Sequence, residues 1–272
     1  MNKILVDGGK RLSGDVIIGG SKNAALPILF GGIVTGGTCV FSGLPRVSDV
    51  LRTLEILKCL GARICFLSGG DVRVDYSTVR SCAPPAHLCS SIRGSTYLLG
   101  AMLTRFGRAE LPGAGGCDFG SRPIDQHLMG FERMGAVARS RGERVLIEAP
   151  SGLYGAPIAL SMPSVGATAN LMIAATLAKG ETVIENAAAE PHVKALADFL
   201  ICAGARISGV GSDRITVVGV SELHGARNRI IPDMIEAGTY LCAGVACGGP
   251  VRVSPVCPDH LGALLDAFTA MG

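Results

Sequence analysis

A cysteine in a glycine-rich segment is the residue of this sequence best suited to chemistry. The segment 111–127 reads LPGAGGCDFGSRPIDQH, so Cys117 has four glycines close by and is followed by Arg122, Pro123 and Asp125. Glycine adds no side chain to a core and loses the most entropy on ordering, so packing does not explain such a run. Two interpretations stand: Cys117 is a small buried hydrophobic residue, or it is a thiol whose reactivity is tuned by nearby cations.

Cations at the openings of predicted helices are the second chemical feature. Helical patterns open at Lys22, Arg93, Gly166 and Glu236, and the first two of these residues are cationic. The N-terminus of a helix already carries partial positive charge, so a cation there costs about 0.3–1 kcal/mol unless an anion lies nearby. Lys22 and Arg93, together with Arg122, therefore predict a phosphate or carboxylate site. The alternative for each of them is a solvated surface cation.

Four segments of about seventy residues repeat one plan that would position these residues. Each has an apolar helix, a glycine turn, a short strand and a second, amphipathic helix. In the first three repeats the opening residue precedes the closing glycine by fourteen positions, at 22–36, 93–107 and 166–180. The predicted strands are 38–41, 109–111, 182–184 and 251–253, and the predicted second helices are 47–60, 124–134, 192–203 and 259–271.

The fourth repeat differs from the others at its end. Two-strand runs follow the first three repeats at 63–74, 137–147 and 206–218, whereas the fourth stops at Gly272. A repeat that lacks its neighbour leaves apolar helix faces uncovered, so we expect a truncated or split protein. We predict a complete three-repeat domain at 22–229. A partial second domain would combine 1–21, with strands at 4–6 and 15–18, and 230–272.

Composition excludes several classes of protein. The 272 residues carry a net charge of +3 and only 17% charged residues, which does not favour nucleic acid as a partner. No apolar run approaches the roughly 18 residues of a membrane span, and the first residues do not resemble a signal peptide. Ten cysteines without a CxxC pair argue against a zinc ribbon or a redox motif. We therefore expect a cytoplasmic protein with reduced thiols.

Nucleotide and metal motifs are also missing from the sequence. It contains no P-loop and no GxGxxG after a strand, so a P-loop or Rossmann site is not expected. The five histidines are scattered, and each is predicted to be a surface or capping residue rather than a metal ligand. We expect Asp125 and His127 to help organise the substrate side of the glycine-rich segment.

Several motifs resemble those of the UDP-N-acetylglucosamine 1-carboxyvinyltransferases, a family of enolpyruvyl transferases. They are GGSKNAALPILF, SIRGSTYLLGAML, PGAGGCDFGSRPIDQH, PSVGATANLMIAATLAKGETVIENAA and GSDRITVVGV, and they extend over essentially the whole chain. The resemblance implies an α/β fold, the inverse α/β barrel of two domains with three repeats each, so that the second domain is incomplete here. The related shikimate-pathway transferase shares that fold but lacks the cysteine loop, which disfavours it.

The resemblance also implies a reaction and roles for particular residues. The enolpyruvyl group of phosphoenolpyruvate passes to the 3-hydroxyl of UDP-N-acetylglucosamine with release of phosphate, in peptidoglycan synthesis, and no metal or organic cofactor is implied. Cys117 matches the general acid that fosfomycin attacks, and Lys22 matches a contact to phosphoenolpyruvate. The residues that match other substrate contacts are Asn23 for the sugar nucleotide, Arg93 and Arg122 for substrate anions, Arg122, Pro123, Ile124, Asp125 and Gln126 for uridine, and Ser164, Val165 and Gly166 for the diphosphate.

The sequence departs from the family pattern in two respects. Met162, Ala189 and Met234 stand where basic residues are frequent in the family, which predicts weaker affinity for the diphosphate. The family's aspartate that takes the hydroxyl proton lies beyond the point that matches Gly272. The alternative to a transferase is therefore a catalytically incomplete UDP-sugar-binding fragment, or one half of a split enzyme that needs a second chain.

Overall fold

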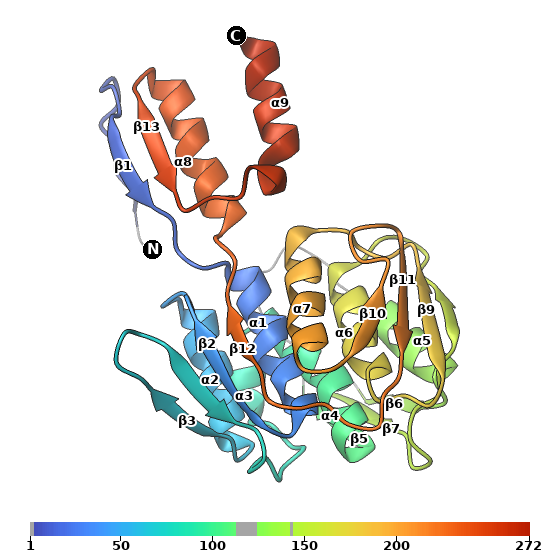
Figure 1. Cartoon of the computed structure of the whole chain (residues 1–272). Coiled ribbons are helices and arrows are strands. Elements are labelled where there is room, and N and C mark those ends of the chain that lie inside the picture. Colours follow the sequence, from blue (N-terminus) through green and yellow to red (C-terminus); the bar gives the residue numbers. More distant parts are fainter. Residues whose placement is uncertain (1–2, 113–123, 142–143) are drawn as a thin grey trace. The chain divides into compact units, whose positions relative to one another are not determined.

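The computed structural model describes residues 3–112, 124–141 and 144–272 (Figure 1). The chain forms two compact units, one of Lys22–Ile231 and one that combines Met1–Ser21 with Pro232–Gly272. The chain therefore leaves the smaller unit once, builds the larger one, and then returns. Among the described helices, none has the length and apolar character that crossing a membrane requires.

Three helices that contact one another form the centre of the larger unit: α1 (Lys22–Gly31), α4 (Leu98–Phe106) and α6 (Val165–Ala175). All residues of α1 from Ala24 onward and all residues of α6 from Ala167 onward are buried. A helix that is apolar on every side is stable only inside a core, which explains why these segments lack a polar face. The 3-10 helix η1 (Gly32–Thr35) extends α1, and η2 (Arg93–Tyr97) precedes α4.

Glycines close the first two of these helical segments in the left-handed conformation. Gly36 has φ of 60° after η1, and Gly107 has φ of 67° after α4. A side chain is strained at such angles, so the spacing from each helix opening to its glycine is a structural requirement. The third segment differs, because α6 ends at Ala175, before Gly180.

Three amphipathic helices pack around this centre: α2 (Ser48–Cys59), α5 (Asp125–Arg133) and α7 (Pro191–Cys202). Helix α1 contacts α2 and α7, and α6 contacts α5 and α7. Each outer helix buries one apolar face, such as Val50, Leu54 and Leu57 of α2, against the centre. A short helix, α3 (Ala86–Cys89), lies between the first and second repeats.

Three sheets cover the outside of the larger unit, one for each repeat. The first has the order β12 (Arg227–Arg229), β2 (Thr38–Ser42), β4 (Val72–Asp75) and β3 (Arg63–Phe66), and the third has the order β8 (Pro157–Ala159), β9 (Glu181–Glu185), β11 (Arg214–Val218) and β10 (Arg206–Ser208). In both, the first strand is parallel to its neighbour and the others are antiparallel. Strand β12 follows the third repeat but completes the sheet of the first.

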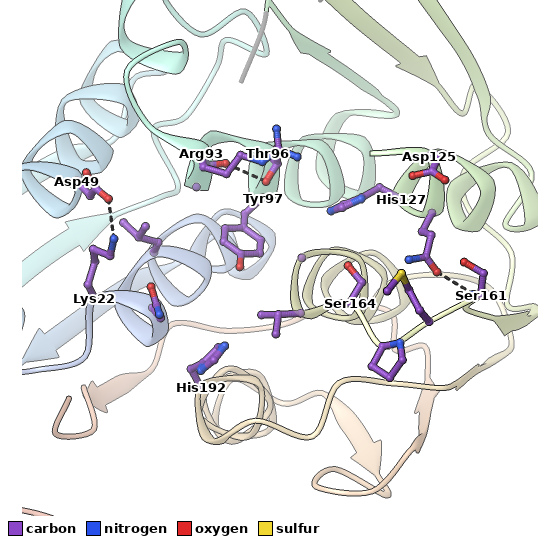
Figure 2. Close-up of a pocket in the computed structure, with 18 residues that line it drawn as sticks. Lys22, Asp49, Arg93, Thr96, Tyr97, Asp125, His127, Ser161, Ser164 and His192 are labelled. Carbon is purple, nitrogen blue, oxygen red and sulfur yellow. Dashed lines mark hydrogen bonds and ion pairs between the residues drawn. The ribbon is translucent and has the colours of Figure 1, made fainter. Parts of the chain in front are cut away.

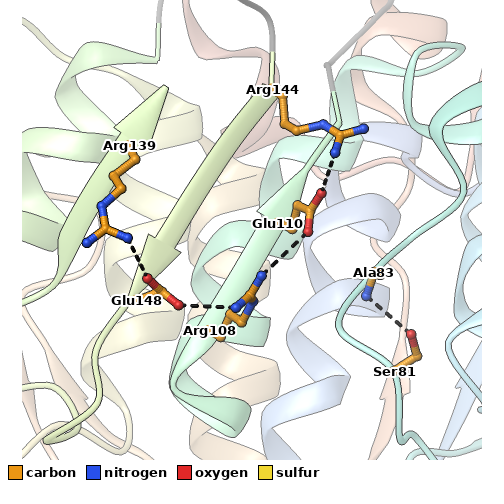
Figure 3. A network of polar contacts seen from close by, with 7 residues as sticks. All are labelled: Ser81, Ala83, Arg108, Glu110, Arg139, Arg144 and Glu148. Atoms are coloured by element: carbon orange, nitrogen blue, oxygen red, sulfur yellow. Dashed lines mark hydrogen bonds and ion pairs between the residues drawn. The ribbon is translucent and has the colours of Figure 1, made fainter. Parts of the chain in front are cut away.

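The second repeat has the order β5 (Arg108–Leu111), β7 (Arg144–Glu148) and β6 (Val137–Arg141). Its outer face carries a chain of ion pairs (Figure 3). Glu148 binds Arg139 and Arg108, each at 3.2 Å, and Glu110 binds Arg144 at 3.2 Å and Arg108 at 3.9 Å. These side chains alternate along the strands with buried residues such as Ala109, as expected for a sheet with one solvated face.

The smaller unit contains the fourth repeat. Strand β1 (Gly14–Ile17) pairs in parallel with β13 (Val251–Ser254), beside α8 (Met234–Cys247), η3 (Pro258–Leu261) and α9 (Gly262–Met271). Asp233 caps α8 by accepting hydrogen bonds from the N–H groups of Ile235 and Glu236. Glu236, the acidic opening residue of this repeat, accepts a hydrogen bond of 2.9 Å from Gly19 N. The carboxylate at this helix opening therefore binds a backbone N–H group of the same unit.

The predicted repeat plan is confirmed, with differences at particular segments. The strand predicted at 4–6 is wrong: Ile4, Leu5 and Val6 are 81–98% exposed and belong to no strand, because β13 pairs with β1 instead. The sequence analysis missed the parallel strands β8 and β12 and the helix α3. The helix predicted at 259–271 is divided into η3 and α9.

Candidate active site

The openings of α1 and α6, and that of η2 before α4, line one cavity of about 760 Å³ in the larger unit (Figure 2). Lys22 begins α1, Arg93 begins η2, and Ser164 caps α6, and all three line this cavity. The first N–H groups of a helix have no acceptor within the helix, and its dipole is positive at that end. Their convergence makes the cavity a favourable place for an anion.

The cavity brings together residues that the sequence analysis assigned to substrate contacts. Those that line it are Lys22, Asn23, Arg93, Asp125, Gln126, Ser164, Val165 and Gly166. Ile124 is not among the lining residues, because its half-buried side chain packs against the main core. Cys117, Arg122 and Pro123 lie outside the described residues.

Hydrogen bonds fix the segment before α6 and the first turn of that helix. The side-chain oxygen of Gln126 accepts a hydrogen bond of 2.8 Å from Ser161 N, which ties this segment to α5. The Ser164 hydroxyl accepts a hydrogen bond of 3.3 Å from Ala167 N. Serine is a preferred N-cap residue because its oxygen replaces the missing backbone acceptor. The start of α6 is therefore held in place at the cavity.

Buried polar side chains hold α6 further along its length. Asn170 donates a hydrogen bond of 3.3 Å to Gly166 O and accepts one of 2.9 Å from Gly100 N of α4. A Cβ on Gly100 would lie 2.5 Å from the Asn170 carbonyl oxygen, so only glycine fits there. Thr168 accepts a hydrogen bond of 3.0 Å from Ala188 N. The bond to Gly100 links α6 to the second repeat, and the bond to Ala188 links it to the segment before α7.

Lys22 has an acidic neighbour that the sequence analysis missed. Its Nζ atom lies 3.1 Å from Oδ2 of Asp49, which belongs to the first turn of α2 and also lines the cavity. The side chains are 44% and 30% exposed, so the pair adds little to stability. The helix dipole by itself predicts an external anion near Lys22, and Asp49 provides part of the compensating negative charge. No local pattern indicates a pairing across 27 residues.

His127 is buried at the edge of the cavity. It is 5% exposed, and within the described ranges neither of its ring nitrogens has a hydrogen-bond partner. Burial lowers its pKa to about 4, the charge of Arg93 acts in the same direction, and Asp125 opposes them. A Cβ on Gly166 would lie 2.9 Å from Nε2 of the ring, so the ring lies against the first turn of α6.

The prediction of surface or capping histidines is wrong for two of the five. His127 and His192, which is 8% exposed, are both buried and line the cavity. The sequence analysis also missed Tyr97 and Pro163 of the lining. Met162, singled out as a departure from the family pattern, lines the cavity and is 63% exposed. Among the described residues, no group of three His, Cys, Asp or Glu side chains is arranged to hold a metal ion.

Comparison with known proteins decides the family. Residues 6–272 match the family model of EPSP synthase (3-phosphoshikimate 1-carboxyvinyltransferase). The chain belongs to this family. Among solved members, the enolpyruvyl transferase NikO from Streptomyces tendae superposes with a TM-score of 0.83 at 26% identity, over 97% of this chain and 62% of that one. An EPSP synthase from Acinetobacter baumannii shares the fold, with a TM-score of 0.68 at 22% identity over 86% of this chain and 53% of that one. The predicted fold class, an α/β inverse barrel of enolpyruvyl transferase type, is confirmed.

Curated relatives within the family have a narrower name. The chain is 44% identical over its full length to UDP-N-acetylglucosamine 1-carboxyvinyltransferase 2 of Carboxydothermus hydrogenoformans and covers 64% of that protein. It is 42% identical to the UDP-N-acetylglucosamine 1-carboxyvinyltransferase of Saccharophagus degradans, over 97% of this chain and 63% of the relative. The chain thus spans slightly less than two thirds of the length of these relatives.

Proposed function

We propose that this chain binds phosphoenolpyruvate and UDP-N-acetylglucosamine and transfers the enolpyruvyl group to the sugar 3-hydroxyl, as a cytoplasmic step of peptidoglycan synthesis. The observation that carries the proposal is the convergence of the helix openings with Lys22, Asn23 and Arg93 in one cavity. The name shared by relatives at 42–44% identity supports this choice of substrates. The cysteine segment, as read from the sequence, supports it over a shikimate substrate.

Different regions of the cavity would bind different parts of the two substrates. The diphosphate of the sugar nucleotide would lie at the start of α6, where Ser164, Val165 and Gly166 supply backbone N–H groups to an anion. Asn23 would contact the sugar, and the segment 122–126 would hold the uridine. Lys22 would face the phosphate of phosphoenolpyruvate, which would compete for the ammonium group with Asp49, 3.1 Å from it.

The proposed reaction adds the 3-hydroxyl oxygen to C2 of phosphoenolpyruvate while a proton adds to C3 and the hydroxyl proton passes to a base, which gives a tetrahedral ketal. The C2–O bond to phosphate then breaks, C3 loses a proton, and the enolpyruvyl ether remains. Cys117 would deliver the proton to C3, because a thiol with an ordinary pKa of about 8.5 is largely protonated at neutral pH. Lys22, Arg93 and Arg122 would stabilise the phosphate and carboxylate charges, an electrostatic contribution that is often the largest in catalysis.

A second candidate function is binding of the UDP-sugar without turnover. It is favoured by the share of the relatives that the chain spans, 63–64%. In the family that the sequence resembles, the aspartate that accepts the hydroxyl proton belongs to the remaining part.

Phosphate release from phosphoenolpyruvate in the presence of UDP-N-acetylglucosamine tests the proposal. We expect turnover that is lost in Cys117→Ser, because a hydroxyl is too weak an acid, and kept in Cys65→Ser, which alters an exposed thiol on β3. Thermal stabilisation by the sugar nucleotide without turnover would establish the second candidate instead. Stabilisation by shikimate 3-phosphate but not by the sugar nucleotide would refute both.

A further inference from the structure

The buried ring of His127 differs in its hydrogen bonding from most buried polar groups. It is 5% exposed, and neither Nδ1 nor Nε2 has a hydrogen-bond partner in the part of the chain that the structure describes. The large majority of buried side-chain polar atoms in proteins have at least one partner, and an orphaned group calls for an explanation. Since His127 lines the cavity, a ligand bound there is the partner that its position offers.

The position of the ring within the cavity indicates which part of a ligand it would meet. His127 lies in α5, and a Cβ on Gly166 would be 2.9 Å from its Nε2 atom. Gly166 belongs to the first turn of α6, whose free N–H groups favour an anion. The buried ring and the helix opening are therefore two independent features that converge on one anion position.

Burial and the charge of Arg93 favour the neutral form of the ring. Burial and the charge of Arg93, from η2, lower the pKa of His127 to about 4, and Asp125, on its own helix, only partly opposes them. Helix α6 has no charged side chain, and the other ionisable groups of the described lining are Lys22, Asp49, Tyr97 and His192. A bound dianion would reverse this balance, because it attracts the proton and compensates Arg93.

We infer that His127 takes up a proton from solvent when the diphosphate of a UDP-sugar binds at the start of α6, and that it holds the diphosphate as an imidazolium. The inference rests on the proposed function and adds a residue to that site. One proton passes from the solution to the ring, and no covalent bond to the ligand forms. Met162 on the same wall carries no charge, so the imidazolium adds a cation that this wall lacks.

Proton uptake can be measured directly by calorimetry on the full chain. UDP-N-acetylglucosamine is titrated at pH 6 in buffers of different ionisation enthalpy, and the dependence of the binding heat on the buffer gives the number of protons taken up. The sugar diphosphate does not titrate near this pH, whereas the phosphate of phosphoenolpyruvate does, so the sugar nucleotide is used alone. We expect uptake approaching one proton per ligand. We also expect a dissociation constant that rises up to tenfold per pH unit until the pH passes the pKa of His127 in the complex.

Two variants locate the proton. Uptake should disappear in His127→Gln, which remains uncharged, and should be unchanged in His87→Gln, which alters an exposed histidine of α3. Should His127→Gln fail to fold, nitrogen NMR of the histidines in the wild-type protein gives the same information, since a buried ring must change from neutral to protonated on binding. Binding without uptake, or uptake that persists in His127→Gln, overturns the inference and leaves the proposed function intact. Absence of binding overturns both.

Discussion

Tyr76 offers a sharp test of how the centre of the larger unit is held together. Its ring is fully buried, and its hydroxyl donates a hydrogen bond of 2.7 Å to the carbonyl of Leu29. Leu29 lies in the last turn of α1, just before η1 continues the helical segment. Gly32 makes room for the ring, because any Cβ there would overlap it. Burial raises the pKa of this phenol, so it remains a donor at every accessible pH.

The change Tyr76→Phe removes the hydroxyl and keeps the ring in place. A buried acceptor left without its donor costs about 1–3 kcal/mol, and little cavity forms. For a unit of 210 residues (22–231), a loss of about 2 kcal/mol lowers the melting temperature by about 4–8 °C. Binding of UDP-N-acetylglucosamine should not change, because Tyr76 is not among the residues that line the cavity.

Thermal and urea unfolding followed by circular dichroism measure this loss. Tyr154→Phe is the matched control. The side chain of Tyr154 is 45% exposed, so loss of its hydroxyl should cost less than about 0.5 kcal/mol. Equal stability of the two variants would refute the reasoning, because the buried hydrogen bond would then make no net contribution to the free energy of unfolding. A loss well above 3 kcal/mol would show that the ring itself had moved.

Three further predictions concern the cavity. Asp49→Asn should change the free energy of unfolding by less than about 1 kcal/mol, since the pair with Lys22 is partly exposed; it should tighten phosphoenolpyruvate binding by removing a negative charge, and weaker binding in a thermal-shift titration would contradict this. Because the pKa of His127 is lowered to about 4 in the folded protein, the unfolded chain binds more protons, so stability should fall by about 3 kcal/mol between pH 6.5 and 4. The free energy of unfolding of His127→Gln, measured with urea, should lack that part of the pH dependence. A pH profile equal to that of the wild-type protein would exclude the contribution of His127. Met162→Lys should lower the dissociation constant of UDP-N-acetylglucosamine several-fold, with an effect that decreases at high salt; calorimetry showing no change would mean that position 162 does not face the diphosphate.

The sequence predicted those parts of the fold that depend on local patterns. The helices that begin at Lys22 and Arg93 were found because their apolar residues and closing glycines recur at one spacing, and Gly36 and Gly107 have the positive φ that this requires. The short strands β8 and β12 were missed because three residues show no usable alternation, and β12 reads Arg-Asn-Arg. Their place in a sheet depends on partners far away in the chain.

The same distinction applies to the cavity. The presence of Lys22 and Arg93 in the cavity could be predicted from their positions at helix openings. That of Ser164 could be predicted from the resemblance to the family. Asp49 could not, since its contact with Lys22 arises only when α2 packs on α1. The burial of His127 could have been predicted, because it lies four positions before Phe131 on the buried face of an amphipathic helix, but a histidine was taken there as a sign of exposure.

The pairing of β1 with β13 has a consequence for the order of folding. Gly14 pairs with Val251, 237 positions later, so the smaller unit cannot form this sheet until residue 251 has been synthesised. Closing a flexible loop of that length costs about 2 kcal/mol more than closing one of twenty residues. Folding of the intervening unit removes this penalty, because its compact form replaces the flexible loop. We therefore expect the larger unit to fold first, which shortens the path between the two separated pieces of the smaller unit before they pair.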